Sequence, residues 1–334
     1  GSSTDCPAMQ LSWKQRMRGW ETDMDVFDDT NRSKDTITSG APRREEMAGR
    51  RTDPPRNHFI DVLKGICIIF VVITHFSWTK QEHFLYLFPF WIDMAVPLFM
   101  LISGYVYSIS FQKNKIDHIG QAYLIENTAS KMIRYTVPFL ITYSLEELVY
   151  LIHGNIPLSF DGIFSMGKTF LTGGIGPGSY YYPVMMQFIF LFPIVYFILK
   201  KYKFNGVVIC GLMNAVYELL QRAYEMNETC YRLLIFRYLL LIAVGCYIAG
   251  YDTHLNGKAS LITCLIGISF LIAYCYLGYE PKILIHWTPT SFLACFYIIP
   301  IAMLFIPKLK NVHFAPLELL GKASYHIFLP QMVW

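Results

Sequence analysis

Apolar runs of bilayer-spanning length recur along the chain and are separated by short polar segments. About 20 mostly apolar residues, each rising about 1.5 Å in a helix, cross a bilayer. The runs cover residues 59–79, 87–111, 132–153, 181–199, 206–224, 231–251, 259–278 and 289–307, and a ninth begins near Ala323 and continues to Trp334. This pattern predicts an all-α fold, a polytopic transmembrane helix bundle.

Two segments depart from the simple pattern. The fifth run is the weakest predicted span because Asn214, Glu218 and Gln221 interrupt it. Residues 155–180 are too apolar for an ordinary exposed loop and are too often broken by glycine for a helix. Irregular backbone at membrane depth must be buried in protein or line a cavity. We therefore interpret residues 155–180 as a re-entrant segment over the outer mouth of the bundle, with a glycine-rich surface loop as the alternative.

Composition favours a membrane protein and argues against several other classes. Of the 334 residues, 54% are hydrophobic and only 16% are charged, whereas soluble domains carry about 25% charged residues. The net charge of +4 gives little support to nucleic-acid binding. The eight cysteines show no paired CxxC spacing, so we predict neither a disulfide framework nor a metal site.

The chain divides into two parts. Residues 1–57 mix charges, Gly, Pro and Ser without periodicity, and we predict a disordered cytoplasmic tail. Residues 58–334 form the membrane domain. The chain lacks an initiator Met and stops inside an apolar segment, so we expect a fragment that is incomplete at least at its C-terminus.

Lysine and arginine in the connections predict the orientation. One set of alternate connections is rich in lysine: Lys113, Lys115, Lys131, Lys200, Lys201, Lys203, Lys258, Lys308, Lys310 and Lys322. The other set holds only Lys80, Lys168, Arg222 and Lys282. The richer set falls on the side of the arginine-rich tail, so the positive-inside rule predicts a cytoplasmic N-terminus.

The first apolar run carries three ionisable residues, Asp61, Lys64 and His75. Lys64 and His75 are eleven residues apart, close to three helical turns, and Asp61 lies one turn before Lys64. All three are therefore expected on one helix face. An ionisable group within a span costs about 2.5–3.5 kcal/mol and usually faces a protein interior or a wet cavity. Asp61 and Lys64 are equally compatible with snorkelling to the headgroups, but His75 lies toward the far end of the run.

Asp93 lies near the start of the second run, which returns across the membrane. It is therefore expected at the depth of His75, where it is a candidate partner that orients the imidazole. An interfacial acid near the headgroups is the alternative.

Six blocks of the chain, taken in order, resemble the signatures of the integral-membrane acyltransferase-3 family. The blocks are LKGICIIFVVITH, AVPLFMLISGY, KMIRYTVP, GPGSYYYPVMMQFIFLFP, FRYLLLIAVGCYIAG and LLGKASYHIFLPQ. The resemblance covers about residues 56–334 and implies nine to ten helices in the full protein, with the last one or two truncated here. Two positions depart from the family pattern: Lys64 stands where the family usually has Arg, and Gln331 stands where it often has His.

The resemblance implies an enzyme of the bacterial inner membrane. Such an enzyme moves an acyl group, acetyl in the simplest case, from cytoplasmic acyl-CoA to a hydroxyl of an extracytoplasmic glycan or lipid-linked sugar. His75 is the expected catalytic base, because an imidazole with an unperturbed pKa of about 6.5 suits proton transfer near neutral pH. A transient acyl-histidine is the alternative route.

The remaining site residues are assigned from the same resemblance and from depth. Lys64, Lys131 and Arg134 are expected near the cytoplasmic face, where they could hold the phosphates of acetyl-CoA. Arg237 lies within its span and either binds donor or acceptor or pairs with Glu146 or Glu147. The acceptor-binding candidates are Gln187, Tyr181 and Asp61.

Two rival functions remain open from the sequence. A polytopic transporter or flippase for a lipid-linked sugar would also bury charges around a central path, although internal repeats typical of transporters are not found. A family member without activity, acting as a membrane partner of another protein, is the second rival.

Overall fold

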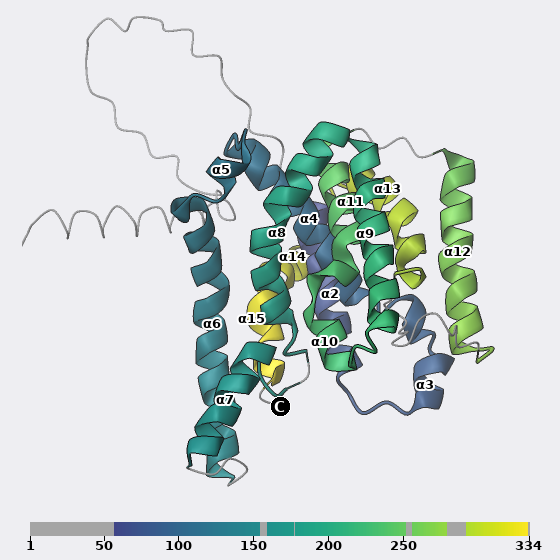
Figure 1. Ribbon diagram of the computed structural model, residues 1–334. Coiled ribbons are helices and arrows are strands. Elements are labelled where there is room, and N and C mark those ends of the chain that lie inside the picture. The colour runs from purple at the N-terminus through teal and green to yellow at the C-terminus, as the bar shows by residue number, and fades with distance from the viewer. Residues whose placement is uncertain (1–56, 154–158, 177, 252–255, 279–291, 333–334) are drawn as a thin grey trace, which may run out of the picture. The chain divides into compact units, whose positions relative to one another are not determined.

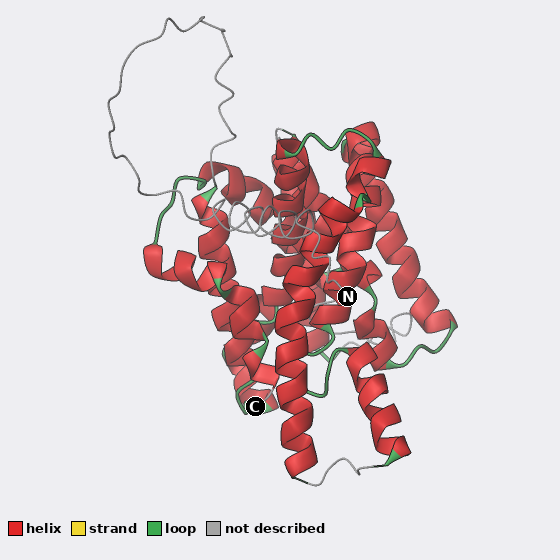
Figure 2. Cartoon of the chain, turned by 90° about the vertical axis from the view of Figure 1, so that its left-hand side faces the viewer, coloured by secondary structure: helices red, strands yellow, loops and turns green. Residues whose placement is uncertain are grey.

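The computed structural model describes residues 57–153, 159–176, 178–251, 256–278 and 292–332. Every regular element in these residues is helical and no strand occurs among them (Figure 1, Figure 2). The all-α prediction is therefore confirmed. The predicted disordered tail lies outside the described residues except for its last residue, Asn57, and so does part of the eighth apolar run.

Helices follow the predicted apolar runs in order. The longer ones are α2 (His58–Thr74), α4 (Ala95–Lys113), α6 (Ile125–Ile152), α7 (Phe160–Thr172), α8 (Tyr181–Tyr202), α9 (Phe204–Ala223), α11 (Leu239–Gly250), α12 (Gly257–Cys275) and α13 (Ile298–Lys308). The short ones are α3 (Lys80–Leu85), α5 (Ile119–Ala122), α10 (Glu228–Leu233), α14 (Ala315–Lys322) and α15 (Ser324–Phe328). Four 3₁₀ turns complete the set: η1 (Phe88–Phe90), η2 (Ile235–Tyr238), η3 (Ala294–Tyr297) and η4 (Pro330–Met332).

Three segments in the described residues are long and apolar enough to cross a membrane: Phe88–Lys113, Tyr181–Tyr202 and Gly257–Cys275. Two shorter apolar segments, Ile235–Gly250 and Ala294–Lys308, each begin with a 3₁₀ turn. A 16- or 15-residue stretch is short of the length that an untilted span requires. The helices differ in length more than the runs of apolar residues suggest.

Two pairs of helices approach at glycines. A Cβ atom at Gly104 of α4 would overlap the Ile242 carbonyl oxygen of α11, and one at Gly245 of α11 would overlap the Leu101 carbonyl oxygen. The α2–α14 pair repeats this arrangement, with Gly65 against Leu317 and Gly321 against Asp61. Small residues let helix backbones come this close. These four glycines belong to four of the six blocks that carry the family resemblance.

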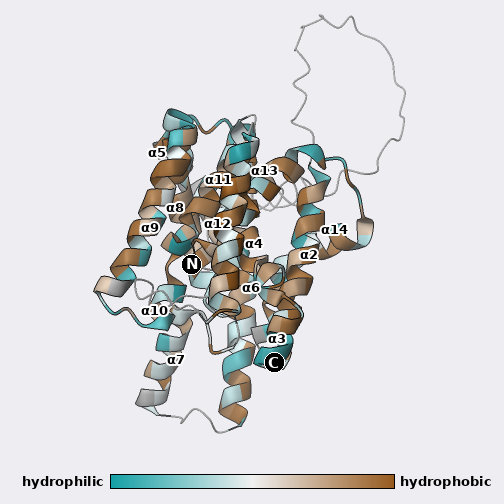
Figure 3. Cartoon of the chain, turned by 90° about the vertical axis from the view of Figure 1, so that its right-hand side faces the viewer, coloured by the Kyte–Doolittle hydropathy of each residue, from teal (hydrophilic) through white to brown (hydrophobic). Residues whose placement is uncertain are grey.

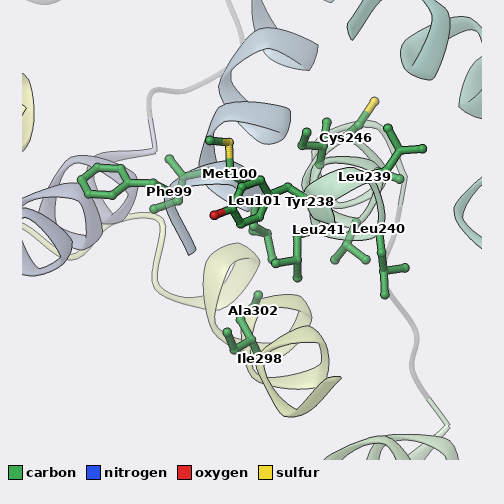
Figure 4. Close-up of a cluster of buried hydrophobic side chains, with 14 of the residues drawn as sticks. Phe99, Met100, Leu101, Tyr238, Leu239, Leu240, Leu241, Cys246, Ile298 and Ala302 are labelled. Carbon is green, nitrogen blue, oxygen red and sulfur yellow. The ribbon is translucent and has the colours of Figure 1, made fainter. Parts of the chain in front are cut away.

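The α4–α11 contact continues into the main core. Leu101 and Met100 of α4, Leu241 of α11, and Ala302 of α13 converge there (Figure 4). Met100 and Leu101 are fully buried. A fully buried side chain of this size contributes about 1.5–3 kcal/mol when water is the reference; in a bilayer, close packing supplies most of the helix–helix attraction.

The polar residues of the fifth run share one buried face of α9. Asn214, Glu218 and Gln221 recur at helical spacing, and each is at most 4% exposed. They point toward the segment around η2, where Asn214 accepts a hydrogen bond from the Leu240 N–H. The interruption of the run is thus an internal polar stripe, and the predicted helix is confirmed.

Residues 155–180 contain a regular helix, which corrects the prediction that glycines exclude one. Helix α7 runs from Phe160 to Thr172, capped at its start by the Ser159 hydroxyl and at its end by Gly173 with φ +94°. Gly167 sits in open space within this helix. The glycines that break the backbone are confined to the segment after Thr172.

Large apolar side chains are exposed on several helices, and hydrophobic residues are frequent along the helices in Figure 3. On α12 the exposed residues include Leu261, Leu265, Ile268 and Ile272. Only 17% of the most apolar window of α12 is buried. Exposed apolar surface on this scale marks contact with a membrane or a partner, and lipid is the environment that agrees with the composition.

Candidate functional site

His75 lies at the end of α2, not within it. The helix stops at Thr74, five residues before the predicted span ends, and His75 forms its C-cap. The side chain is exposed, and among the described residues it makes no hydrogen bond. Its Nε2 atom lies 3.8 Å from the point that a Cβ atom on Gly178 would occupy. The His75 imidazole therefore lies beside the glycine-rich stretch that follows α7, residues 173–176 and 178, which we call the glycine segment.

Backbone conformation explains why this segment needs glycine. Gly173, Gly174 and Gly178 have φ values of +94°, +116° and +80°, which side chains with a Cβ disfavour. The Glu146 carboxylate on α6 holds the segment, accepting hydrogen bonds from the Ile175 N–H (3.1 Å) and the Gly176 N–H (2.6 Å). The glycine segment is thus fixed by a buried acid on the neighbouring helix.

A second buried acid, Glu147, anchors α7. Its Oε1 accepts a hydrogen bond from the Thr169 hydroxyl at 2.9 Å, and Tyr143 donates to the Met166 carbonyl in the same turn. Glu146 is 1% exposed and Glu147 is 3% exposed. The Oε2 atom of each is buried without a hydrogen-bond partner. Within the described part of the chain, neither acid has a cationic partner.

Aromatic side chains form a continuous path of contacts that leads from this site toward Lys131. Next to His75, the Phe328 ring contacts Gly178 and stacks obliquely on Tyr181, with ring centroids 4.8 Å apart. From Tyr181 the path passes to Tyr325, whose hydroxyl donates to the Tyr135 carbonyl.

The path then turns onto α4. The Tyr135 and Tyr107 hydroxyl groups interact, and the Lys131 ammonium lies 4.9 Å from the centre of the Tyr107 ring. Tyr181, expected to bind acceptor, and Lys131, expected to bind donor, thus both belong to one row of aromatic contacts that starts at Phe328. A cation over an aromatic face is held by the ring quadrupole.

Lys64 and Asp61 pair with each other. The Lys64 Nζ lies 3.5 Å from the Asp61 Oδ1 across one helical turn, which the predicted shared face allows. Asp61 is 3% exposed because α14 covers it through Gly321. Arg134 is exposed on α6. Of the expected donor ligands, Lys64 and Lys131 are partly buried and Arg134 is accessible.

Asp93 does not pair with His75, contrary to expectation. Its carboxylate lies 3.2 Å from the Nε2 of His83, a residue of the short helix α3. Helix α3 is itself fixed by a capping box in which Thr79 and Glu82 bond reciprocally. Hydrogen bonds from the Thr79 backbone and hydroxyl hold the pKa of the exposed Glu82 carboxyl below its usual range. The partner of Asp93 therefore comes from the connection that follows α2.

Arg237 belongs to a separate buried cluster. Its guanidinium lies over the rings of Tyr231 (4.7 Å) and Tyr238 (4.8 Å). Among the described residues, an acid within electrostatic reach is Glu218 of α9, which accepts hydrogen bonds from the Tyr231 hydroxyl. The alternative pairing with Glu146 or Glu147 is not formed, because those acids hold α7 and the glycine segment.

The Gln187 side chain bonds to the backbone on both sides of Leu234, where the chain passes from α10 to η2. Its amide donates to the Leu233 carbonyl at 2.7 Å and accepts from the Ile235 N–H at 3.2 Å. Both ends of the side chain are engaged with backbone, so in this structure it shapes the chain leading to Arg237. No acceptor-binding contact follows from this geometry.

Glu146 and Glu147 are the residues of the site that the sequence analysis did not assign to it. The signal was present: two adjacent acids inside an apolar run, followed by the glycine-rich stretch at 173–178. Together with His75 they give an exposed imidazole, a backbone segment with positive-φ glycines, and buried carboxylate oxygens without a hydrogen-bond partner. Such a set can position a hydroxyl and move its proton.

The fold is that of a helical membrane protein, and an exposed imidazole lies near two buried acids at one end of α2. Comparison with protein-family models matches residues 57–334 to the acyltransferase-3 family, whose model is described as an acyltransferase domain. Because the match covers most of the chain, the protein belongs to this family and is a membrane acyltransferase. Neither the curated proteins nor the solved structures gave a match.

Proposed function

We propose that the protein transfers an acyl group, acetyl in the simplest case, from acyl-CoA to a hydroxyl of a glycan or lipid-linked sugar. The donor is cytoplasmic, the acceptor is extracytoplasmic, and the enzyme resides in the bacterial inner membrane with its N-terminus inside. One observation carries the proposal: the unengaged His75 imidazole lies beside a glycine segment, at one end of the aromatic path that leads to Lys131.

In the proposed reaction His75 acts as general base. Its neutral imidazole takes the proton of the acceptor hydroxyl while the hydroxyl oxygen attacks the thioester carbonyl carbon. The tetrahedral intermediate collapses, the carbon–sulfur bond breaks, and the imidazolium returns its proton to the departing CoA thiolate. The products are an ester and free CoA. Backbone N–H groups near the glycine segment that are not bound to Glu146 are candidates to stabilise the oxyanion.

The donor-binding part of the proposal assigns Lys64, Lys131 and Arg134 to the CoA phosphates. The Arg134 side chain is exposed, and Lys131 is held over aromatic rings, so ligand phosphate would find two cations one helical turn apart on α6. The acyl end of the donor would then lie toward the tyrosines that connect Lys131 to His75.

The test uses the full chain in nanodiscs with radiolabelled acetyl-CoA and an extract of bacterial lipid-linked glycans. Label should appear in the glycan fraction in step with CoA release, and hydroxylamine should remove it, as expected for an ester. Protein carrying His75→Ala supplies the background rate.

The same preparation separates the rival functions. A flippase would move a fluorescent lipid-linked sugar across a liposome without consuming acetyl-CoA. A non-catalytic membrane partner would do neither. Wild-type protein that releases no CoA above the His75→Ala background, with intact folding, would overturn the proposal.

A further inference from the structure

His58, His313 and Glu318 form a cluster that the acyl-transfer chemistry does not use. His58 is the first residue of α2, His313 precedes α14, and Glu318 lies in α14. The nitrogen and oxygen atoms that could bind a metal all lie within 4.8 Å of one another. The cluster is at the end of α2 opposite His75, so it is separate from the site described above.

The side-chain contacts within the cluster are long for hydrogen bonds, and the contact between His58 and Glu318 is just short enough to count as one. The His58 Nδ1 lies 3.4 Å from the Glu318 Oε2, and the His313 Nδ1 lies 3.3 Å from the Glu318 Oε1. Nitrogen–oxygen hydrogen bonds are typically about 2.9–3.0 Å long. Two ligand atoms each 2.0–2.2 Å from a tetrahedral ion are about 3.3–3.6 Å apart, from the bond lengths of zinc sites. The three ligand atoms of the cluster, one from each residue, lie within 4.8 Å of one another, so they would close slightly around a bound ion.

The surroundings hold these side chains in place. The His58 and His313 rings lie 3.7 Å apart, centroid to centroid. The His58 N–H donates to the Lys310 carbonyl, and the Glu318 Oε1 also accepts from the Phe314 N–H at 3.2 Å.

We propose that His58, His313 and Glu318 bind one divalent transition-metal ion, Zn²⁺ by preference, which fastens the start of α2 to α14. Two imidazole nitrogens with one carboxylate form a known three-ligand set for zinc, with the fourth position left to water. Imidazole ligands favour zinc and its transition-metal neighbours over Mg²⁺ and Ca²⁺, which prefer oxygen. Because the ion would join two segments more than 250 residues apart, it would stabilise the pairing of α2 with α14.

The test measures metal binding directly. The purified full chain in detergent is stripped with chelator, incubated with Zn²⁺ in the presence of excess Mg²⁺, desalted and assayed for bound metal. About one Zn²⁺ per chain is expected, as for a single mononuclear site. His313→Ala and Glu318→Gln should each lose this ion, and the control His326→Ala, which removes an exposed histidine of α15 outside the cluster, should retain it.

Two further measurements detect the metal site independently of metal counting. Zn²⁺ should raise the melting temperature of the wild type and of His326→Ala but not that of His313→Ala. Co²⁺ in place of Zn²⁺ should give the visible absorption of a tetrahedral site, which His313→Ala should abolish. Equal Zn²⁺ uptake by His313→Ala, or no uptake by the wild type, would overturn the proposal and leave a hydrogen-bonded cluster only.

Discussion

Two regions of the molecule bury glutamates and treat them in opposite ways. In the central bundle, Glu218 of α9 receives hydrogen bonds from Tyr231 and lies near the positive charge of Arg237. Between α6 and α7, Glu146 and Glu147 are just as buried but have no cation among the described residues, and each keeps one oxygen without a partner. A buried charge that is compensated serves structure, whereas buried groups with unused capacity mark a place where a ligand or proton can act.

The same contrast holds for the backbones. The central bundle brings helices together at Gly104 and Gly245, where the backbones touch. Around α7, Gly167 faces open space, and the positive-φ glycines after α7 shape a segment beside His75. Glycine thus permits close packing in one region and an unusual chain path in the other. Substitutions at the α4–α11 contact should therefore mainly change stability, whereas substitutions near α7 and His75 should mainly change activity.

The largest effect is expected from Arg237→Met. Removing the guanidinium takes a positive charge away from the surroundings of the buried Glu218 and removes its contacts with the Tyr231 and Tyr238 rings. Loss of one partner from a fully formed buried ion pair costs about 3–5 kcal/mol, which sets the upper limit for this change. Thermal unfolding in detergent should show a markedly lower melting temperature and a reduced yield of monodisperse protein. The control Arg232→Met breaks only the exposed pair with Glu228 and should change stability by less than about 1 kcal/mol. If the two variants melt at the same temperature, Arg237 does not stabilise the buried Glu218 carboxylate.

His75→Ala is expected to remove activity and spare the fold. Loss of a general base lowers kcat/KM by roughly 10²–10⁴-fold, whereas an exposed side chain without hydrogen bonds contributes little to stability. Transfer of radiolabel from acetyl-CoA to glycan would be compared with the melting temperature of the same preparation. His326→Ala is the matched control and should retain both. A variant at position 75 that transfers label at the wild-type rate would remove this histidine from the mechanism.

Gly104→Ala and Gly167→Ala should separate the two roles of glycine. A Cβ at position 104 would overlap the Ile242 carbonyl oxygen, so α4 and α11 must move apart, at a cost of about 1–3 kcal/mol. A Cβ at position 167 meets no atom within 4 Å, and alanine there should stabilise α7 by up to about 1 kcal/mol. Melting temperatures of the two variants, measured side by side, should shift in opposite directions; a shared direction would contradict the packing interpretation.

The smallest effect is expected from Glu146→Gln. The amide oxygen can still accept from the Ile175 and Gly176 N–H groups, but the hydrogen bonds lose their charge assistance, worth about 1 kcal/mol in total. A looser glycine segment should lower kcat/KM about three- to tenfold with little change in melting temperature. Glu225→Gln, at an exposed loop position, is the control. If Glu146→Gln instead lowers the melting temperature as much as Arg237→Met does, the main role of Glu146 is to stabilise the fold.

Sequence reasoning located the helices better than it located their ends. The apolar runs contain helices because a segment that is uniformly apolar over many residues has no other way to satisfy its backbone in lipid. The end of α2 at Thr74 and the regular helix α7 were missed. In both cases the deciding factor is a local contact, the Ser159 cap of α7 or the turn at His75, and apolar periodicity does not indicate such contacts.

The candidate site was predicted in its parts but not in its pairings. His75 and Lys131 were named from their positions, and a shared face for Asp61 and Lys64 followed from helical spacing. The partners of Asp93 and Arg237 were not predicted correctly, because each lies on an element that short-range spacing cannot place: His83 on α3 and Glu218 on α9. The contacts of Glu146 and Glu147 depend on how α6 packs against α7 and the glycine segment, which spacing along the sequence does not predict.

By itself the sequence determined that this protein is an all-helical membrane protein, and it placed ionisable residues inside or at the edges of its spans. These properties depend on composition and on spacing within one helix, which are local. The tertiary structure alone decided which buried acid lies near Arg237, which buried acids have no cation near them among the described residues, and which glycines bring backbones together. Those outcomes depend on how distant helices pack, because an electrostatic or hydrogen-bond partner must lie within a few ångströms, and only the fold sets that distance.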